Sequence, residues 1–233
     1  MNFYITGDTH RNFTDIEGFC GYNETTADDV MIILGDVGIN YHGVAYDTYL
    51  KQQLAQLPIT LFCVHGNHEN RPENISSYDE VPMFGGVVYI EPEFPNLIFA
   101  RCGEIYRLGD FDVLVVGGAH SINKHELLAQ KSGWWPDEQP SDWIKEETER
   151  NLASRNWQVD IVLTHTCPYK YMPREAFLSG VKEWMTDHTT EKWLETIEER
   201  LDYQVWYCGH FHIEKDVGKM QFLYRSILEL GEY

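Results

Sequence analysis

Residues 30–36 read Val30-Met31-Ile32-Ile33-Leu34-Gly35-Asp36, an apolar run that ends in a glycine and a carboxylate. A run of this length that is rich in β-branched residues is typical of a strand buried on both faces. In α/β sheets built from such strands, ligands bind beyond the carboxyl ends of the strands. The stretch therefore predicts an α/β fold and marks Asp36 as a candidate ligand-binding residue.

Short apolar runs with the same character occur elsewhere in the chain, and each leads into small and polar residues. These runs cover residues 3–6, 59–64, 113–116, 161–163 and 205–208. They lead into Gly7-Asp8, His65-Gly66-Asn67-His68, Gly117-Gly118, Thr164-His165 and Gly209-His210. Because the carboxyl ends of parallel strands meet at one edge of a sheet, we expect these polar side chains to lie close together.

Helical periodicity fills several intervals between the runs. Apolar residues recur at helical spacing in residues 50–57 and 193–201, and Ser141 opens a third helical stretch over residues 141–155. Residues 84–112 and 220–230 lack this periodicity and read as strands. No internal repeat or linker divides the chain. We expect one α/β domain over residues 1–233, with two sheets packed together and helices outside.

Composition limits the classes of function. The 233 residues carry 18 Lys and Arg against 37 Asp and Glu, a formal net charge of −19. This charge argues against long nucleic acid as a partner, while 43% hydrophobic residues exclude a disordered acidic tail. The odd number of cysteines, five, without a Cys-x-x-Cys pair indicates reduced thiols. With no signal peptide and no apolar run long enough for a membrane, we expect a cytoplasmic protein, and the sequence gives no signal for an oligomeric state.

Metal-ligand residue types are concentrated at the predicted strand ends. Taken singly, an Asp after a strand is usually a helix N-cap, and a lone His is usually a surface or core imidazole. Taken together these residues indicate one shared site, because five of the ten histidines fall in these short motifs. Asp8 and His10, and likewise His210 and His212, are two residues apart, so both side chains of each pair can reach one cluster. The candidates are Asp8, His10, Asp36, Asn67, His68, His165, His210 and His212.

The ordered set of motifs resembles that of the calcineurin-like metallophosphoesterases, and residues 117–124 and 133–138 resemble a stretch of the small bacterial and phage-type enzymes among them. The motifs are Gly7-Asp8-Thr9-His10, Gly35-Asp36, Gly66-Asn67-His68-Glu69, Thr164-His165 and Gly209-His210-Phe211-His212. The resemblance covers residues 7–212 and implies a two-sheet β-sandwich flanked by helices, a four-layer fold. Thr164 departs from the pattern, since glycine usually precedes the fourth motif's histidine.

The resemblance also implies two divalent metal ions about 3.5 Å apart. One ion would take Asp8, His10, Asp36 and His212, and the other Asp36, Asn67, His165 and His210, so that Asp36 bridges. The mixed nitrogen and oxygen ligands suit Mn²⁺ first, with Fe or Zn²⁺ as alternatives. His68, which is not a ligand in this scheme, would act as general acid on the leaving oxygen.

The function implied is hydrolysis of phosphodiesters or phosphomonoesters of small substrates, nucleotides among them, by metal-activated hydroxide. Three alternatives are open: a phosphodiesterase of short oligonucleotides, a non-catalytic interaction module on the same fold, and a Cys/His hydrolase built on His165-Thr166-Cys167. Protein Ser/Thr phosphatases of the superfamily carry Asp-Arg after the second motif. This chain has Val37-Gly38 after Asp36 instead, which disfavours that subclass.

Two arginines and two tryptophans near the motifs are further candidates. Arg11 and Arg71 could each bind a phosphate with a forked guanidinium, or could pair with one of the many acidic side chains. Trp134 and Trp135 lie in a Gly/Pro-containing loop that could form a lid or stack a base, or could anchor the loop on the core.

Overall fold

The computed structural model describes residues 1–130, 133–177 and 186–232. Its strands form two mixed sheets, one in the order β13-β1-β2-β3-β6-β5-β4 and the other in the order β11-β12-β10-β9-β8-β7. The first sheet consists of β1 (Phe3–Thr6), β2 (Val30–Ile33), β3 (Thr60–Cys63), β4 (Asp79–Met83), β5 (Gly86–Ile90), β6 (Leu97–Ala100) and β13 (Leu228–Glu229). The second consists of β7 (Ile105–Leu108), β8 (Phe111–Val116), β9 (Ile161–Thr164), β10 (Val205–Cys208), β11 (Lys215–Val217) and β12 (Met220–Phe222).

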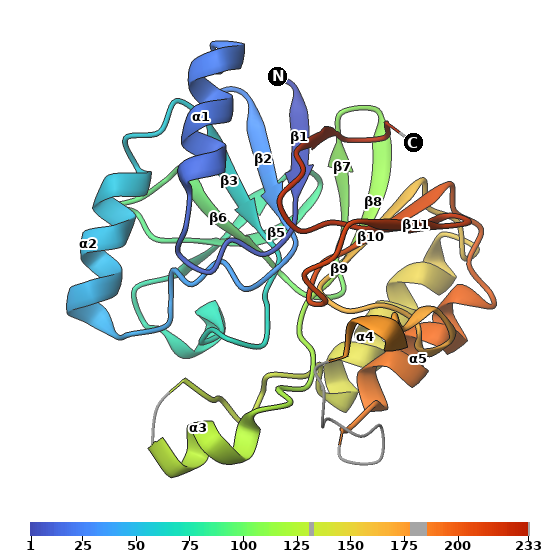
Figure 1. The fold of residues 1–233 in the computed structure, drawn as a ribbon. Helices are drawn as coiled ribbons and strands as arrows, with labels where there is room; N and C mark the ends of the chain where they lie inside the picture. Colours follow the sequence, from blue (N-terminus) through green and yellow to red (C-terminus); the bar gives the residue numbers. More distant parts are fainter. Residues whose placement is uncertain (131–132, 178–185, 233) are drawn as a thin grey trace.

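The two sheets pack face to face, and helices cover their outer faces (Figure 1). Helices α1 (Thr14–Asn23) and α2 (Val44–Leu54) lie on the first sheet, whereas α4 (Asp142–Ser154) and α5 (Thr189–Glu198) lie on the second. Helix α3 (Lys124–Gln130) lies apart from these layers at the lower edge in Figure 1. The structure thus confirms the predicted α/β fold with two sheets flanked by helices.

Burial on both faces explains the continuous apolar runs. In β2, Val30 and Ile32 belong to the core between the sheets, while Met31 and Ile33 face α1 and α2. Successive side chains of a strand point to opposite faces, so a strand covered on both sides needs apolar residues at every position. All four residues of β2 are buried.

Most predicted elements are confirmed. The six apolar runs form β1, β2, β3, β8, β9 and β10, and the three helical stretches correspond to α2, α4 and α5. The Ser141 side chain caps α4, because its Oγ accepts a hydrogen bond from the Ile144 amide at 3.3 Å. Helices α1 and α3 were not expected. Three-residue 3₁₀ turns lie at Pro72–Asn74 (η1), Tyr169–Tyr171 (η2) and Arg174–Ala176 (η3).

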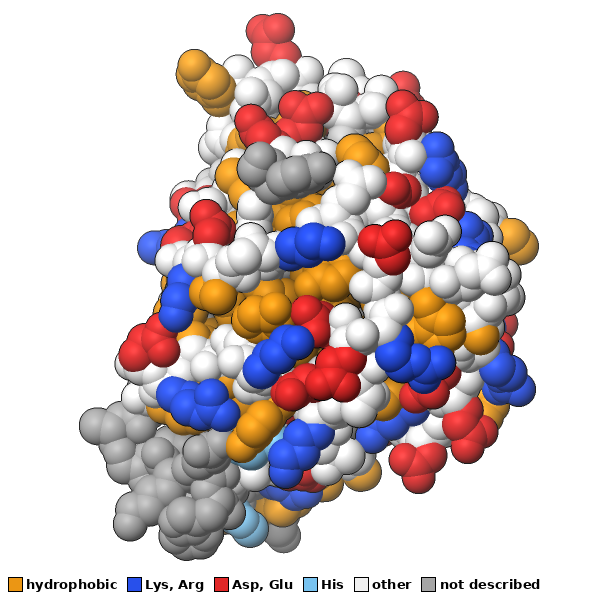
Figure 2. Space-filling model, turned by 90° about the vertical axis from the view of Figure 1, so that its right-hand side faces the viewer, with side chains coloured by type: hydrophobic (Ala, Val, Ile, Leu, Met, Phe, Trp, Pro, Cys, Tyr) orange, Lys and Arg blue, Asp and Glu red, His pale blue; other side chains and the backbone are white. Residues whose placement is uncertain are grey.

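Several chain-wide features bear on location and partners. All five cysteines are buried and unbridged. In the described ranges, no helix has the length and apolar character needed to cross a bilayer. Figure 2 shows the face on the side of α4 and α5, where acidic and basic side chains are interspersed. The excess of acidic residues therefore does not form a continuous negatively charged patch on that face.

The parallel strands set the position of the site. β1, β2 and β3 run parallel in the first sheet, and β8, β9 and β10 run parallel in the second. In Figure 1 their carboxyl ends point toward the lower part of the molecule, between the sheets. The polar residues that follow these strands therefore converge where the two sheets meet.

Candidate metal centre

The chain approaches itself too closely at this edge for ordinary side chains. A Cβ placed on Gly35 would lie 2.1 Å from His165 Nδ1, and one on Gly66 would lie 2.1 Å from Asp36 Oδ1. Four of the candidate residues adopt left-handed backbone conformations, with φ of 44° at His10, 47° at Asp36, 67° at His210 and 51° at His212. Strain of this kind is concentrated at functional sites, where surrounding packing enforces it. The glycines before the polar residues are therefore needed for space.

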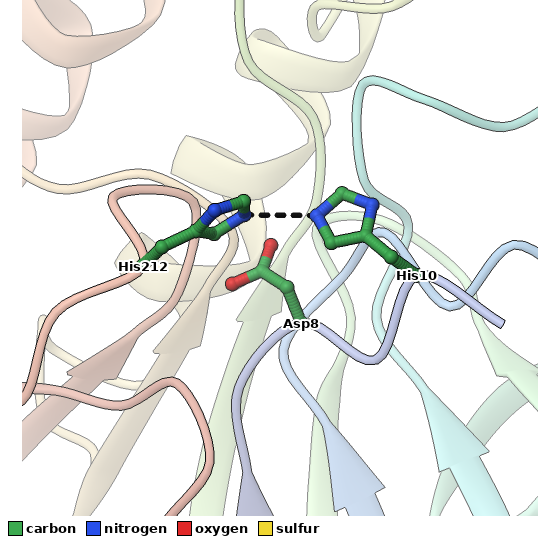
Figure 3. A group of neighbouring side chains, drawn as sticks. All are labelled: Asp8, His10 and His212. Atoms are coloured by element: carbon green, nitrogen blue, oxygen red, sulfur yellow. Dashed lines mark hydrogen bonds between the residues drawn. The ribbon is translucent and has the colours of Figure 1, made fainter. Parts of the chain in front are cut away.

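One group of ligand atoms comprises Asp8, His10 and His212, which lie within 4.8 Å of one another (Figure 3). The two imidazoles face each other above the Asp8 carboxylate, with 2.8 Å between His10 Nε2 and His212 Nε2. The His212 ring also stacks on Tyr224, with 4.6 Å between ring centroids. Residues that follow strands of both sheets thus form a single cluster.

A second group comprises Asp8, Asp36 and His165, again within 4.8 Å of one another. The His165 ring is oriented by Leu34, whose carbonyl oxygen lies 2.7 Å from Nδ1. This leaves Nε2 facing Asn67 Oδ1 at 2.8 Å and Asp36 Oδ1 at 3.6 Å. A histidine fixed through one nitrogen presents the other to a metal, which is a common arrangement at metal sites.

Burial keeps the candidate imidazoles in the protonation state that binds metals, but it acts in the opposite sense on Asp8. Burial lowers the pKa of the imidazoles of His10, His165, His210 and His212. Neutral imidazole is the form that binds metals. Burial raises the pKa of the Asp8 carboxyl, and the nearby Asp36 charge adds to this effect. Both favour the protonated form, whereas a metal binds the carboxylate. Burial acts in the same direction on Asp36, but attraction to the His165, His68 and His10 imidazoles in their protonated forms lowers its pKa well below the usual range.

The residues present fit divalent metal ions. Asp8 Oδ1 is buried and has no hydrogen-bond partner among the described residues, and a carboxylate oxygen left in this way is costly. Its neighbours are imidazole nitrogens and a second buried carboxylate. Such a set of nitrogen and oxygen donors suits Mn²⁺, Fe or Zn²⁺.

The side chains of two predicted site residues lie outside both groups of ligand atoms. His210 donates its backbone amide to Asp8 Oδ2 at 2.8 Å and stacks edge-on against His165, yet its side chain is in neither group. His68 donates its backbone amide to Asp36 Oδ1 at 2.8 Å, and its half-buried side chain lines the adjacent cavity. Their roles as ligand and as general acid stay predictions.

The two arginines are engaged by the protein. Arg11 donates to the Gly38 carbonyl at 2.6 Å and pairs with Asp47 at 3.0 Å. Arg71 is buried and donates to the Asp137 carbonyl at 2.7 Å. Neither lines the cavity at the candidate ligands. Their role in substrate binding stays a prediction, and the contacts match the ion-pair alternative.

The structure also bears on the Cys/His hydrolase alternative and on the two tryptophans. Cys167 is fully buried, and burial raises the pKa of its thiol well above the ordinary value, so the thiolate of a Cys/His hydrolase is disfavoured. Trp134 packs under Lys124 and Trp135 packs edge-on against Tyr41. Neither tryptophan lines the cavity at the candidate ligands.

Two supporting residues had no role assigned from the sequence. Ser121 Oγ accepts a hydrogen bond from Asn67 Nδ2 at 2.9 Å, which fixes the amide so that Oδ1 faces His165. Glu69 is fully buried and accepts from the amides of Gly66 and Gly38, at 2.8 Å and 3.1 Å. The only sequence signals were their positions, Ser121 after a Gly-Gly pair and Glu69 at the end of a motif.

Comparison with known proteins agrees with this geometry. The sequence model of the calcineurin-like phosphoesterase family matches residues 1–214. No curated protein matches the chain. One crystal structure aligns with a TM-score of 0.58 at 15% identity, covering 98% of this chain and 95% of the other. The crystal structure of phosphopantetheinyl hydrolase (PptH) from Mycobacterium tuberculosis aligns with a TM-score of 0.49 at 15% identity, covering 96% of this chain and 88% of the other.

Proposed function

Because the chain belongs to the calcineurin-like phosphoesterase family, we propose that it is a dinuclear-metal hydrolase of small phosphodiesters or phosphomonoesters, nucleotides among them. The family supports a metal-dependent phosphoesterase, whereas the number of ions and the substrates are our proposal. One observation carries it: the two groups of ligand atoms around Asp8 lie beside a cavity of about 440 Å³.

The position of Asp36 supports two ions. Its Oδ2 lies 3.8 Å from His10 Nε2, while its Oδ1 lies 3.6 Å from His165 Nε2. A carboxylate that turns one oxygen to each group is suited to bridge. Divalent ions held here, Mn²⁺ in our proposal with Fe or Zn²⁺ as alternatives, would lower the pKa of water and neutralise phosphate charge.

The remaining residues would orient the metal ligands and donate a proton to the leaving oxygen. Leu34 and Ser121 fix the ligand atoms of His165 and Asn67. His68, fixed through its backbone to Asp36, would donate a proton to the leaving oxygen. The net charge of −19 supports a small substrate over long nucleic acid. The buried, unbridged cysteines support a cytoplasmic location as part of this proposal.

Metal content and turnover test the proposal together. Protein stripped with chelator and reloaded with Mn²⁺, Fe or Zn²⁺ should bind two ions per chain by elemental analysis. It should then hydrolyse 4-nitrophenyl phosphate, bis(4-nitrophenyl) phosphate or a cyclic nucleotide. Asp36→Asn should lose metal, whereas His125→Ala, which changes an exposed histidine of α3 outside the cavity lining, should not. Two bound ions without turnover on any substrate would favour the non-catalytic interaction module.

A further inference from the structure

The cavity extends well beyond the candidate ligands. Its volume of about 440 Å³ is within the range of pockets that hold whole small molecules, and phosphate alone would fill only part of it. Beside the candidate ligands, the cavity is lined by apolar side chains that the proposed chemistry does not use. These are Ile122, Met172, Phe177, Phe211 and Ile213.

This apolar wall comes from three separate segments. Ile122 follows β8, Met172 and Phe177 flank the 3₁₀ turn η3, and Phe211 and Ile213 follow β10. Phe211 packs edge-on against Phe222, with ring centroids 5.9 Å apart, so its ring is held by the core. Ile122 is 49% exposed, which leaves apolar surface in contact with water at the cavity. Burying that surface under an apolar ligand would be favourable.

A buried carboxyl group also lines this cavity. Glu191 of α5 is only 3% exposed, and its Oε1 accepts from Thr166 Oγ1 at 2.8 Å. Its Oε2 is buried with no hydrogen-bond partner among the described residues, and His188 Nδ1 lies 3.9 Å from it. A buried carboxylate oxygen in this state gains from any donor that a ligand brings.

We propose that the apolar wall of this cavity binds the organic group of the phosphoester, and that this group is apolar and ends in a hydrogen-bond donor for Glu191. The inference rests on the proposed function, because it requires the phosphate to lie at the metal ligands. It assigns the substrate class by two contacts: apolar surface at Ile122 and the neighbouring wall, and an amine or hydroxyl at Glu191.

Three phosphonates test the subsite without turnover. Methylphosphonate, phenylphosphonate and 4-(aminomethyl)phenylphosphonate share the phosphorus group and differ only in the organic part. Calorimetric titration of the metal-loaded protein should show affinity rising in that order, by about tenfold for the ring. Glu191→Gln should remove most of the further gain given by the aminomethyl group, because the amide carries no charge.

A matched pair of variants locates the apolar contact. Ile122 lines the cavity, whereas Leu128 on α3 does not, and the two are similarly exposed at 49% and 46%. Ile122→Ala should reduce the preference for phenylphosphonate over methylphosphonate by about fivefold, and Leu128→Ala should leave it unchanged. Equal affinity for all three phosphonates, or an equal effect of the two variants, would overturn the subsite. Graded binding without hydrolysis of any ester would support the subsite and contradict the proposed function.

Discussion

His10 and His212 lie 202 positions apart in the chain, and their Nε2 atoms are 2.8 Å from each other. His10 follows β1 of the first sheet, whereas His212 follows β10 of the second, so the pair spans the junction between the sheets. Because burial lowers the pKa of both imidazoles, the two nitrogens can offer lone pairs at one point beside Asp8. This pairing supports a metal ion at the junction between the two sheets.

His212→Ala should remove one metal ion and leave the other. In the proposed scheme His212 belongs to one ligand set only, whereas the group around Asp36 and His165 remains complete. Elemental analysis after reloading should find about one ion per chain instead of two. Two retained ions would contradict the assignment of His212. The His125→Ala variant controls for loss of a histidine.

His68→Ala should keep both ions and lose turnover selectively. The side chain lines the cavity without belonging to either ligand group, so its removal leaves the ligands intact. General acid catalysis contributes about 100-fold or more, and it matters most for leaving groups of high pKa. Rates on alkyl esters should therefore fall far more than rates on 4-nitrophenyl esters. Equal losses on both substrates would remove His68 from proton transfer.

The sequence predicted the strands and the convergence of the site because both follow from local rules. Runs such as Val30–Leu34 are apolar at every position only when both faces are covered, and Gly35 before Asp36 reflects the space taken by the His165 ring. The position of ligand residues after parallel strands then places them at one edge. The family motifs added the order of the residues.

Supporting contacts could not be predicted because they depend on packing between distant segments. Ser121 meets Asn67 across 54 positions, and Tyr224 stacks on His212 only after β10 and the chain following β12 come together. Helix α1 was not predicted, for a different reason. It buries only Ile16 and Cys20, so its apolar pattern is too sparse to reveal a helical face.

Gly66→Ala should disrupt the centre, whereas Gly18→Ala should stabilise the fold. A Cβ on Gly66 would lie 2.1 Å from both Asp36 N and Asp36 Oδ1, so Asp36 must move. A Cβ on Gly18, inside α1, meets nothing within 4 Å, and alanine in a helix is favoured over glycine by about 1 kcal/mol. Metal content and urea unfolding of both variants measure the contrast. Full metal occupancy in Gly66→Ala would show that the close approach is not needed.

Glu191→Gln should become more stable relative to the wild type as the pH rises. Burial raises the pKa of Glu191 to about 7 from the ordinary value of 4.5. Between these two values the native state keeps a proton that the unfolded state has lost, so wild-type stability falls with increasing pH. Above pH 7 both states are ionised and the penalty is constant, at most about 3 kcal/mol.

Urea unfolding of the two proteins between pH 4 and pH 8 measures this difference. The free energy of unfolding of Glu191→Gln minus that of the wild type should rise across the range and level off near its upper end. Glu199→Gln, at the exposed end of the same helix, is the matched control for replacing a glutamate by glutamine in this segment. A flat difference for Glu191→Gln would mean that this carboxyl has the same pKa in the native and unfolded states. The donor expected from the ligand would then face a carboxylate that its surroundings already stabilise.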